Sequence, residues 1–167
     1  MPATLMVASD GNFVCIRIQG HANFASSIDF KNLVSQLWDK GVNRFCVELS
    51  QCVTMDSTFL GILAALGSRA IESEGTHVIE LVNPNARILE TLETLGISHL
   101  FKTFHSTEIH NTEFNPAEPA PQASRAEITR TSLEAHQTLM DINPANIPKF
   151  KDVAQFLAED MKKRVKD

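Results

Sequence analysis

The stretch from Arg44 to Leu66, RFCVELSQCVTMDSTFLGILAAL, decides how the fold of this chain is predicted. In its first part, Arg44–Leu49, the side-chain character alternates and Phe, Cys and Val are frequent, which predicts a central strand. Residues 50–55 predict a turn that changes from polar to apolar. Residues 59–66 are almost wholly apolar, so we expect a helix that is buried on most of its sides.

A serine lies where this turn meets the helix. Asp56, Ser57 and Thr58 all belong to the residue types that cap helices. A helix N-terminus presents unpaired N–H groups and the positive end of a dipole, so it tolerates a phosphate. A phosphate on Ser57 would add about −1.5 to −2 charges beside Asp56 and would change what the surface binds. The simpler interpretation is that Ser57 or Asp56 only caps the helix.

The composition predicts one domain of ordinary size with an appendage. The chain has 167 residues, of which 43% are hydrophobic, and this is enough for a core. A formal net charge of −5 without a basic stripe argues against nucleic acid as a partner. The cysteines, Cys15, Cys46 and Cys52, are odd in number and form no CxxC motif, which indicates reduced, buried thiols in the cytosol. We expect neither a metal site nor a cofactor, because no tight cluster of ligand residues is visible.

The N-terminal residues, MPATLMVASDG, lack the basic and long apolar regions of a signal peptide. The longest apolar run is far shorter than the ~20 residues that a bilayer span needs. We therefore expect a protein without a membrane span, located in the cytoplasm.

The remaining pattern predicts strands and helices in alternation. Two apolar runs flank Ser9-Asp10-Gly11-Asn12, which predicts a hairpin. After a loop at residues 20–24, Ser26 or Ser27 is expected to cap a helix that ends at Lys40. The later elements are a strand at 77–82, a helix from Asn83-Pro84 to Gly96, and a short strand or extended edge at 97–104. This order predicts an α/β fold in which helices cover a mixed, mostly parallel sheet with an antiparallel edge.

The C-terminal third has a different composition. The segment from His105 to Ala123 contains three prolines and few apolar residues, which is typical of a linker, and we expect it to be mobile. Two amphipathic helices follow, the first of them capped by Ser124. Because a helix pair of this length is not stable alone, we expect it to pack on the first domain, on a second copy of the chain or on a partner.

Three segments resemble the STAS domain of bacterial anti-sigma factor antagonists. VELSQCVTMDSTFLGIL at Val47–Leu63 resembles the family's signature, in which an acidic-Leu-Ser strand end leads to Met/Ile-Asp-Ser-Ser/Thr-Gly-Leu-Gly. VCIRIQG at Val14–Gly20 resembles the second strand, and NPNARILETLETLGISHLF at Asn83–Phe101 resembles the last helix. The resemblance implies a STAS-like sandwich over residues 3–107, followed by a linker at 108–123 and a helical segment at 124–167 that lies outside the family pattern.

The resemblance also implies a function. Ser57 would be the serine that a partner serine kinase of the anti-sigma type phosphorylates with its own ATP. The unphosphorylated protein would bind this anti-sigma factor, phosphorylation would block the binding, and a PP2C-type phosphatase would reset it. Partner contacts are expected at Asn23, Asp56, Thr58 and Phe59, and a homodimer is a further option. Two of these residues depart from the family, which usually has Gly in place of Phe59 and often Asp in place of Asn23.

Three alternatives stay open beside this interpretation. A serine hydrolase would need a nucleophile turn such as G-x-S-x-G, which is absent around Ser57, and the six histidines are scattered. An Asp56 phosphoacceptor would need further carboxylates to hold Mg²⁺, and none is apparent at the other strand ends. The third alternative is a STAS module that does not switch, as a scaffold in a signalling complex or an accessory subunit of a lipid-transport complex.

Overall fold

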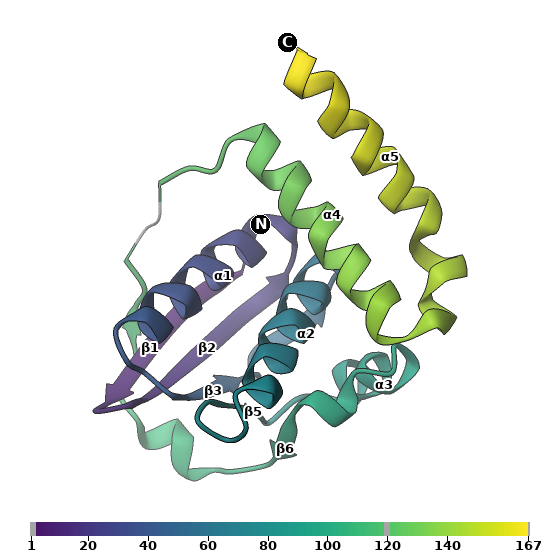
Figure 1. The fold of residues 1–167 in the computed structure, drawn as a ribbon. Coiled ribbons are helices and arrows are strands. Elements are labelled where there is room, and N and C mark those ends of the chain that lie inside the picture. Colours follow the sequence, from purple (N-terminus) through teal and green to yellow (C-terminus); the bar gives the residue numbers. More distant parts are fainter. Residues whose placement is uncertain (1–2, 119–120, 167) are drawn as a thin grey trace.

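The computed structural model describes residues 3–118 and 121–166, and its centre is a seven-stranded mixed sheet (Figure 1). The hydrogen-bonded order is β6-β5-β3-β2-β1-β7, and β4 pairs with the far end of β2. The strands are β1 (Thr4–Asp10), β2 (Phe13–Ala22), β3 (Arg44–Glu48), β4 (Cys52–Met55), β5 (Val78–Val82), β6 (Lys102–Phe104) and β7 (Asn115–Pro116).

The pairing confirms the predicted mixed, mostly parallel sheet. β1 and β2 form the predicted antiparallel hairpin, whose turn needs the positive φ of 64° that Gly11 adopts. From β2 onward the sheet is parallel, with β3 beside β2, β5 beside β3 and β6 beside β5. The ends of β2, β3 and the parallel strand β4 therefore point to the same edge of the molecule, where the first helix begins after β2 and the second begins after β4.

Three helices cover the sheet, as the alternation predicted, and all of them pack on one face: α1 (Phe24–Asp39), α2 (Ser57–Glu72) and α3 (Ala86–Thr94). The core between them is apolar and closed. Phe59 and Leu63 of α2 have no exposed surface, and Ile16 and Leu81 of the sheet are equally buried. Burial on this scale stabilises the fold by about 25 cal/mol for each Å² of apolar surface removed from water.

A smaller apolar cluster lies on the opposite face of the sheet. It consists of Cys15, Cys46 and Val82, with Ile109 and Phe114 packed against them. The segment after β6 thus lines this second face before β7 pairs with β1, and the amide of Ala117 donates to the carbonyl of Leu5 at 3.0 Å. Part of the segment predicted as a linker is therefore attached to the sheet.

Three local predictions were wrong. The residues predicted as a turn before Asp56 contain β4, which pairs with the end of β2 after an irregularity at Gly20/His21. The cap of α1 is Asn23, whereas Ser26 and Ser27 are buried in the first turn. The helix predicted from Asn83-Pro84 begins later, because its cap is Asn85.

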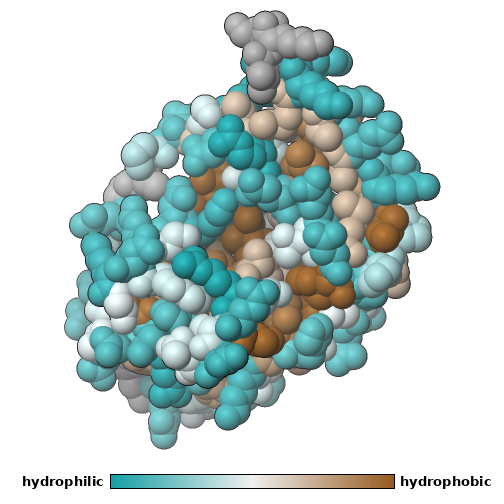
Figure 2. Space-filling model, viewed as in Figure 1, coloured by the Kyte–Doolittle hydropathy of each residue, from teal (hydrophilic) through white to brown (hydrophobic). Residues whose placement is uncertain are grey.

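Two antiparallel helices follow the predicted linker, α4 (Arg125–Ile142) and α5 (Ile147–Lys166). Ser124 caps α4 as predicted. Figure 1 shows α4 lying across α2 and α5 lying on the outer side of α4, so the pair packs on the first domain, which is the first of the three predicted options. Figure 2 shows hydrophobic residues along the seam between the two helices, on a face that is otherwise mostly hydrophilic.

In the part of the chain that the structure describes, none of the helices is both long enough and apolar enough to cross a membrane.

Candidate functional site at the start of helix α2

Asp56 joins the starts of two helices. Its Oδ1 accepts a hydrogen bond from the amide of Phe59 at 2.8 Å and so caps α2, while Oδ2 accepts from the amide of Phe24 at 2.8 Å in the first turn of α1. The amide of Asp56 in turn donates to the carbonyl of Ala22 at 2.9 Å. The carboxylate therefore satisfies unpaired N–H groups of both helices and holds their N-termini together.

Asn23 directly precedes Phe24 in the chain and caps α1. Its Oδ1 accepts from the amide of Ser26 at 3.2 Å, and the hydroxyl of Ser26 accepts from the amide of Asn23 at 3.0 Å, which completes a capping box. Asn23 and Asp56, both predicted as partner contacts, are thus brought to one edge by two adjacent helix starts. The positive ends of both helix dipoles face this edge.

Ser57 is the first residue of α2, and its side chain is half-buried. The Oγ atom lies 2.8 Å from Nε2 of His136 in α4. The other ring nitrogen, Nδ1, lies 2.6 Å from the carbonyl oxygen of Ser132. A carbonyl can only accept, so Nδ1 carries a proton, and in the neutral ring Nε2 is then the acceptor for the hydroxyl proton of Ser57.

Thr58 also faces α4. Its hydroxyl lies 3.0 Å from the hydroxyl of Ser132, and the residue is 6% exposed. Phe59, by contrast, points into the core and has no exposed surface, with its ring centroid 5.1 Å from that of Phe30. The expectation that Phe59 contacts a partner does not fit this burial, because its ring fills the space between α1 and α2.

The C-terminal helices cover this site. A Cβ atom at Gly61 would overlap the backbone carbonyl of Ala135, so α2 and α4 are in backbone contact one turn beyond Ser57. His136 is 3% exposed because α4 lies on α2 and because the ring of Phe150 in α5 packs on it, with the centroids 5.2 Å apart. The site is therefore formed by residues at the start of α2 and residues of the C-terminal helices.

The sequence did not indicate His136 or Ser132 as members of the site. They are separated from Ser57 and Thr58 by 79 and 74 positions, so no spacing rule connects them. The one available signal is the run Ser132, Ala135, His136 and Leu139, which follows the i, i+3, i+4, i+7 spacing of a single helix face. Apart from Leu139, that face consists of small and polar residues, which a search for apolar positions does not select.

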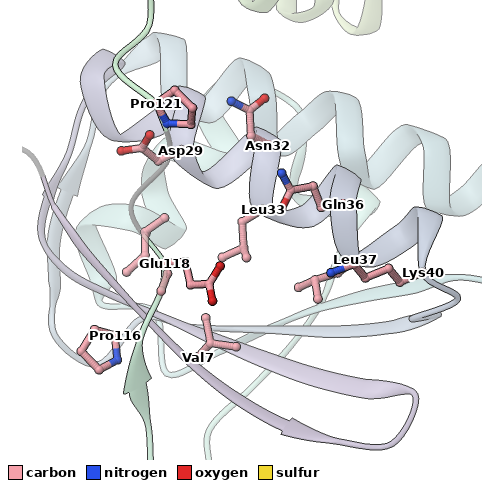
Figure 3. A pocket seen from close by; sticks show the side chains of 12 residues that line it. Val7, Asp29, Asn32, Leu33, Gln36, Leu37, Lys40, Pro116, Glu118 and Pro121 are labelled. Atoms are coloured by element: carbon pink, nitrogen blue, oxygen red, sulfur yellow. The ribbon is translucent and has the colours of Figure 1, made fainter.

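Ser57 and His136 are placed like a nucleophile and its base, but the surroundings differ from those of a hydrolase. Nδ1 of His136 faces a backbone carbonyl instead of the carboxylate that orients a catalytic histidine. The cavity of about 410 Å³ in Figure 3 lies along α1, where Asp29, Leu33 and Lys40 face Val7 and Pro116, and its lining includes neither Ser57 nor His136.

Residues 3–118 and 121–166 show neither a metal site nor an activated thiol. No group of three or more His, Cys, Asp or Glu residues within these ranges could hold a metal ion. Burial raises the pKa of the Cys52 thiol to about 11, and a hydrogen bond with Cys15 together with burial raises the pKa of Cys46 further. These thiols therefore stay protonated at neutral pH and are poor nucleophiles.

Comparisons with known proteins agree with the fold of the first domain. Residues 4–109 match the model of the STAS domain. TM1081 of Thermotoga maritima, described as an anti-sigma factor antagonist, is 22% identical with a TM-score of 0.55 over 62% of this chain and 88% of its own. The anti-sigma factor antagonist SpoIIAA in its unphosphorylated form is 17% identical with a TM-score of 0.55 over 64% of this chain and 90% of its own.

The phosphorylated form of SpoIIAA, a Bacillus cell fate determinant, gives a TM-score of 0.52 at 17% identity, over 64% of this chain and 94% of its own. At these identities the likeness shows a shared fold. No curated protein sequence matches the chain. The matched region ends before α4, so the helices that cover Ser57 lie outside it.

Proposed function

Because residues 4–109 place this chain in the STAS domain family, we propose that it is a regulatory protein of the anti-sigma factor antagonist type with Ser57 as its phosphoacceptor. The observation that carries the proposal is the position of Ser57 as the first residue of α2, directly after the cap Asp56. A serine at this place has the N–H groups of the first helical turn beside it, and these favour a phosphate.

The proposed reaction moves the γ-phosphoryl group of ATP, held by a partner serine kinase, to Oγ of Ser57. The hydroxyl proton leaves, ADP is released, and a phosphate monoester forms. The surface around Asn23 and Asp56 then gains about −1.5 to −2 charges. We propose that the unphosphorylated surface binds the kinase, which is also the anti-sigma factor, that the phosphate prevents this binding, and that a PP2C-type phosphatase hydrolyses the ester.

Phosphopeptide mapping of the full chain, purified from its own cells, tests the proposal. We expect one phosphate on Ser57 that disappears after phosphatase treatment and in the Ser57→Ala variant. The matched control is Ser9→Ala, which removes an exposed hydroxyl at the end of β1 and should leave the phosphate in place. Fragmentation between residues 57 and 58 separates Ser57 from Thr58. A phosphate that is still present in the Ser57→Ala variant would contradict the assignment of Ser57 as the phosphoacceptor.

A second function is favoured by one specific observation. The hydroxyls of Ser57 and Thr58 are both hydrogen-bonded to α4, as they would be if their role were to fix the C-terminal helices. In that case the protein is a STAS scaffold or accessory subunit that does not switch. Ser57 free of phosphate across growth and stress conditions would favour this second function.

A further inference from the structure

Helices α2 and α4 meet along one line of contacts. Ser57 faces His136, Thr58 faces Ser132, and Gly61 faces Ala135. The proposed phosphoacceptor is the first member of this line. The three contacts use small or polar side chains, so they hold the two helix backbones close to each other.

The closeness of the two helices leaves no volume between Ser57 and α4 for an added group. The three atoms nearest to a Cβ built on Gly61 all belong to Ala135, two of them in its backbone. The distance from Oγ of Ser57 to Nε2 of His136 is that of a direct hydrogen bond, 2.8 Å. A phosphoryl group on Oγ would have to occupy the place of the imidazole.

We propose that a phosphate on Ser57 and the docking of α4 on α2 exclude each other. The C-terminal hairpin, defined here as α4, α5 and the turn at residues 143–146, is then an internal ligand of α2 that phosphorylation displaces. In cells this coupling operates through the phosphorylation proposed above, and in that respect it rests on the proposed function.

The first consequence concerns the kinase. Transfer in line needs Oγ of Ser57 open toward the γ-phosphorus, and His136 closes that approach in the docked state. The kinase therefore acts on the fraction of molecules in which the hairpin is undocked. The apparent affinity of the kinase for this protein is its affinity for the undocked state multiplied by the undocked fraction. The hairpin therefore sets how readily Ser57 is phosphorylated.

The second consequence concerns the phosphorylated protein. Docking it again would bury about −1.5 to −2 charges between α2 and α4. The groups that face this place are the hydroxyls of Thr58 and Ser132, the imidazole of His136 and, next along the chain, the carboxylate of Asp56. The N–H groups of the first turn of α2 favour the phosphate whether or not the hairpin is docked, so docking adds only the imidazole. One imidazole does not balance a phosphate beside a carboxylate, and a buried, poorly paired charge is costly. The phosphate therefore keeps the hairpin undocked.

A second anchor holds the turn of the hairpin. The side-chain amide of Asn146, which is fully buried, donates to the carbonyl of Leu95 after α3 and to that of Leu139, both at 2.9 Å. This turn lies at the end of the hairpin remote from Ser124. The phosphate acts on Ser132 and His136 in the middle of α4, so the α4 contact is lost before the turn contact.

The test uses the full chain with phosphoserine placed at position 57 by codon reassignment, which needs no kinase. Hydrogen–deuterium exchange of the α4 amides is the measurement. Because a helix freed from its packing is not stable alone, we expect their exchange to accelerate about tenfold or more while β3 and β5 keep their protection. Phosphoserine placed at the exposed Ser9 is the matched control and should leave α4 unchanged.

A second variant disturbs the packing of α2 on α4 without adding a charge. Gly61→Ala adds a methyl group whose three nearest atoms all belong to Ala135 of α4, so it should also accelerate exchange of the α4 amides. The matched control is Gly67→Ala in the same helix, where the methyl group meets the ring of Phe101 at 2.7 Å and α4 should stay docked. Both substitutions replace a mid-helix glycine, so their intrinsic effect on α2 is the same.

Unchanged or increased protection of α4 in the chain with phosphoserine at 57 would overturn the proposal, and increased protection would mean that His136 binds the phosphate. Wild-type protection of α4 in Gly61→Ala would overturn the claim that backbone contact holds the hairpin. Failure of the proposed function is a separate result. It would appear as a Ser57 that cells never phosphorylate, whatever the installed phosphoserine does to α4.

Discussion

The Nε atom of Arg17 in β2 donates a hydrogen bond of 2.7 Å to Oε2 of Glu48 in β3, and the Glu48 side chain has no exposed surface. Oε1 of Glu48 accepts from the amide of Ser50 at 2.9 Å and from the side chain of Asn83 at 3.3 Å. The guanidinium of Arg17 lies 4.0 Å from the ring centroid of Phe114. One carboxylate thus connects two central strands, the end of β5 and the segment that leads to α4.

The stability of the fold should therefore fall in acid. Burial raises the pKa of Glu48, but the hydrogen bonds from Ser50, Arg17 and Asn83 outweigh it and hold the pKa below its ordinary value of 4.5. A lowered pKa in the folded state gives stability that is fully present above the unfolded value and is lost as the pH falls through the folded value. We expect the urea midpoint to be flat from neutral pH to about 5 and to drop below about 4.5, with a smaller drop in Glu48→Gln.

Removing the Glu48 carboxylate should be much more harmful than removing an exposed ion pair. Glu48→Ala leaves the guanidinium of Arg17 buried without its partner, which costs about 3–5 kcal/mol. The comparison is Lys31→Ala, which breaks the 3.6 Å pair with Glu134, whose two side chains are 39% and 53% exposed, and which should cost under about 1 kcal/mol. Urea denaturation measures both, and equal losses would contradict the structural role assigned to Glu48.

Asp56 should matter more for stability than an ordinary helix cap. Asp56→Ala removes the acceptor of two amides in two helices, so we expect a loss of about 2–3 kcal/mol. Ser124→Ala removes a single capping bond at the start of α4 and should cost about 1 kcal/mol. If the two variants unfold at the same denaturant concentration, Asp56 does not join α1 to α2 in solution.

The bond between Ser57 and His136 should be visible as a coupling energy. Ser57→Ala leaves Nε2 of the buried His136 without a partner, and we expect a loss of about 1–3 kcal/mol. The double variant Ser57→Ala/His136→Ala should be more stable than the sum of the single losses predicts, by about 1 kcal/mol. Losses that simply add would show that the two side chains do not interact.

The segment at residues 105–123 should be the first site of proteolysis, and the cut chain should stay together. A glutamate-specific protease is expected to cleave after the exposed Glu108 or Glu113. Because α4 packs on α2 and the turn binds Leu95, the two fragments should elute as one species in size-exclusion chromatography, with two masses in the denatured sample. Fragments that separate would contradict the docked hairpin.

The regular part of the fold was predictable because its apolar residues repeat with the period of the element that contains them. Alternation in β2 and β3 and the apolar run of α2 gave these elements and their order. β4 was missed because its four residues have no periodicity of their own, and it is a strand only through its pairing with β2. The start of α3 was predicted too early because Asn83 adopts a left-handed φ of 58° just before the helix, which its cap Asn85 then begins.

The site was only half predictable, for a different reason. Asp56 and Ser57 are neighbours in sequence, and the helix that follows them marks them as an N-terminus. The cover over Ser57 comes from a helix whose buried face holds Thr131, Ala135 and His136, residues that no hydrophobic pattern selects. Their burial depends on Gly61, which lets α4 come close enough for a hydroxyl and an imidazole to meet.

The separation of 79 positions between Ser57 and His136 also sets an order in time. A ribosome that adds about 5–20 residues per second releases the serine about 4–16 s before the histidine that will cover it. Each new molecule therefore passes once through a period in which its serine exists and its cover does not. A kinase near the ribosome would meet an open site in every nascent chain, whereas a kinase elsewhere would meet a closed one.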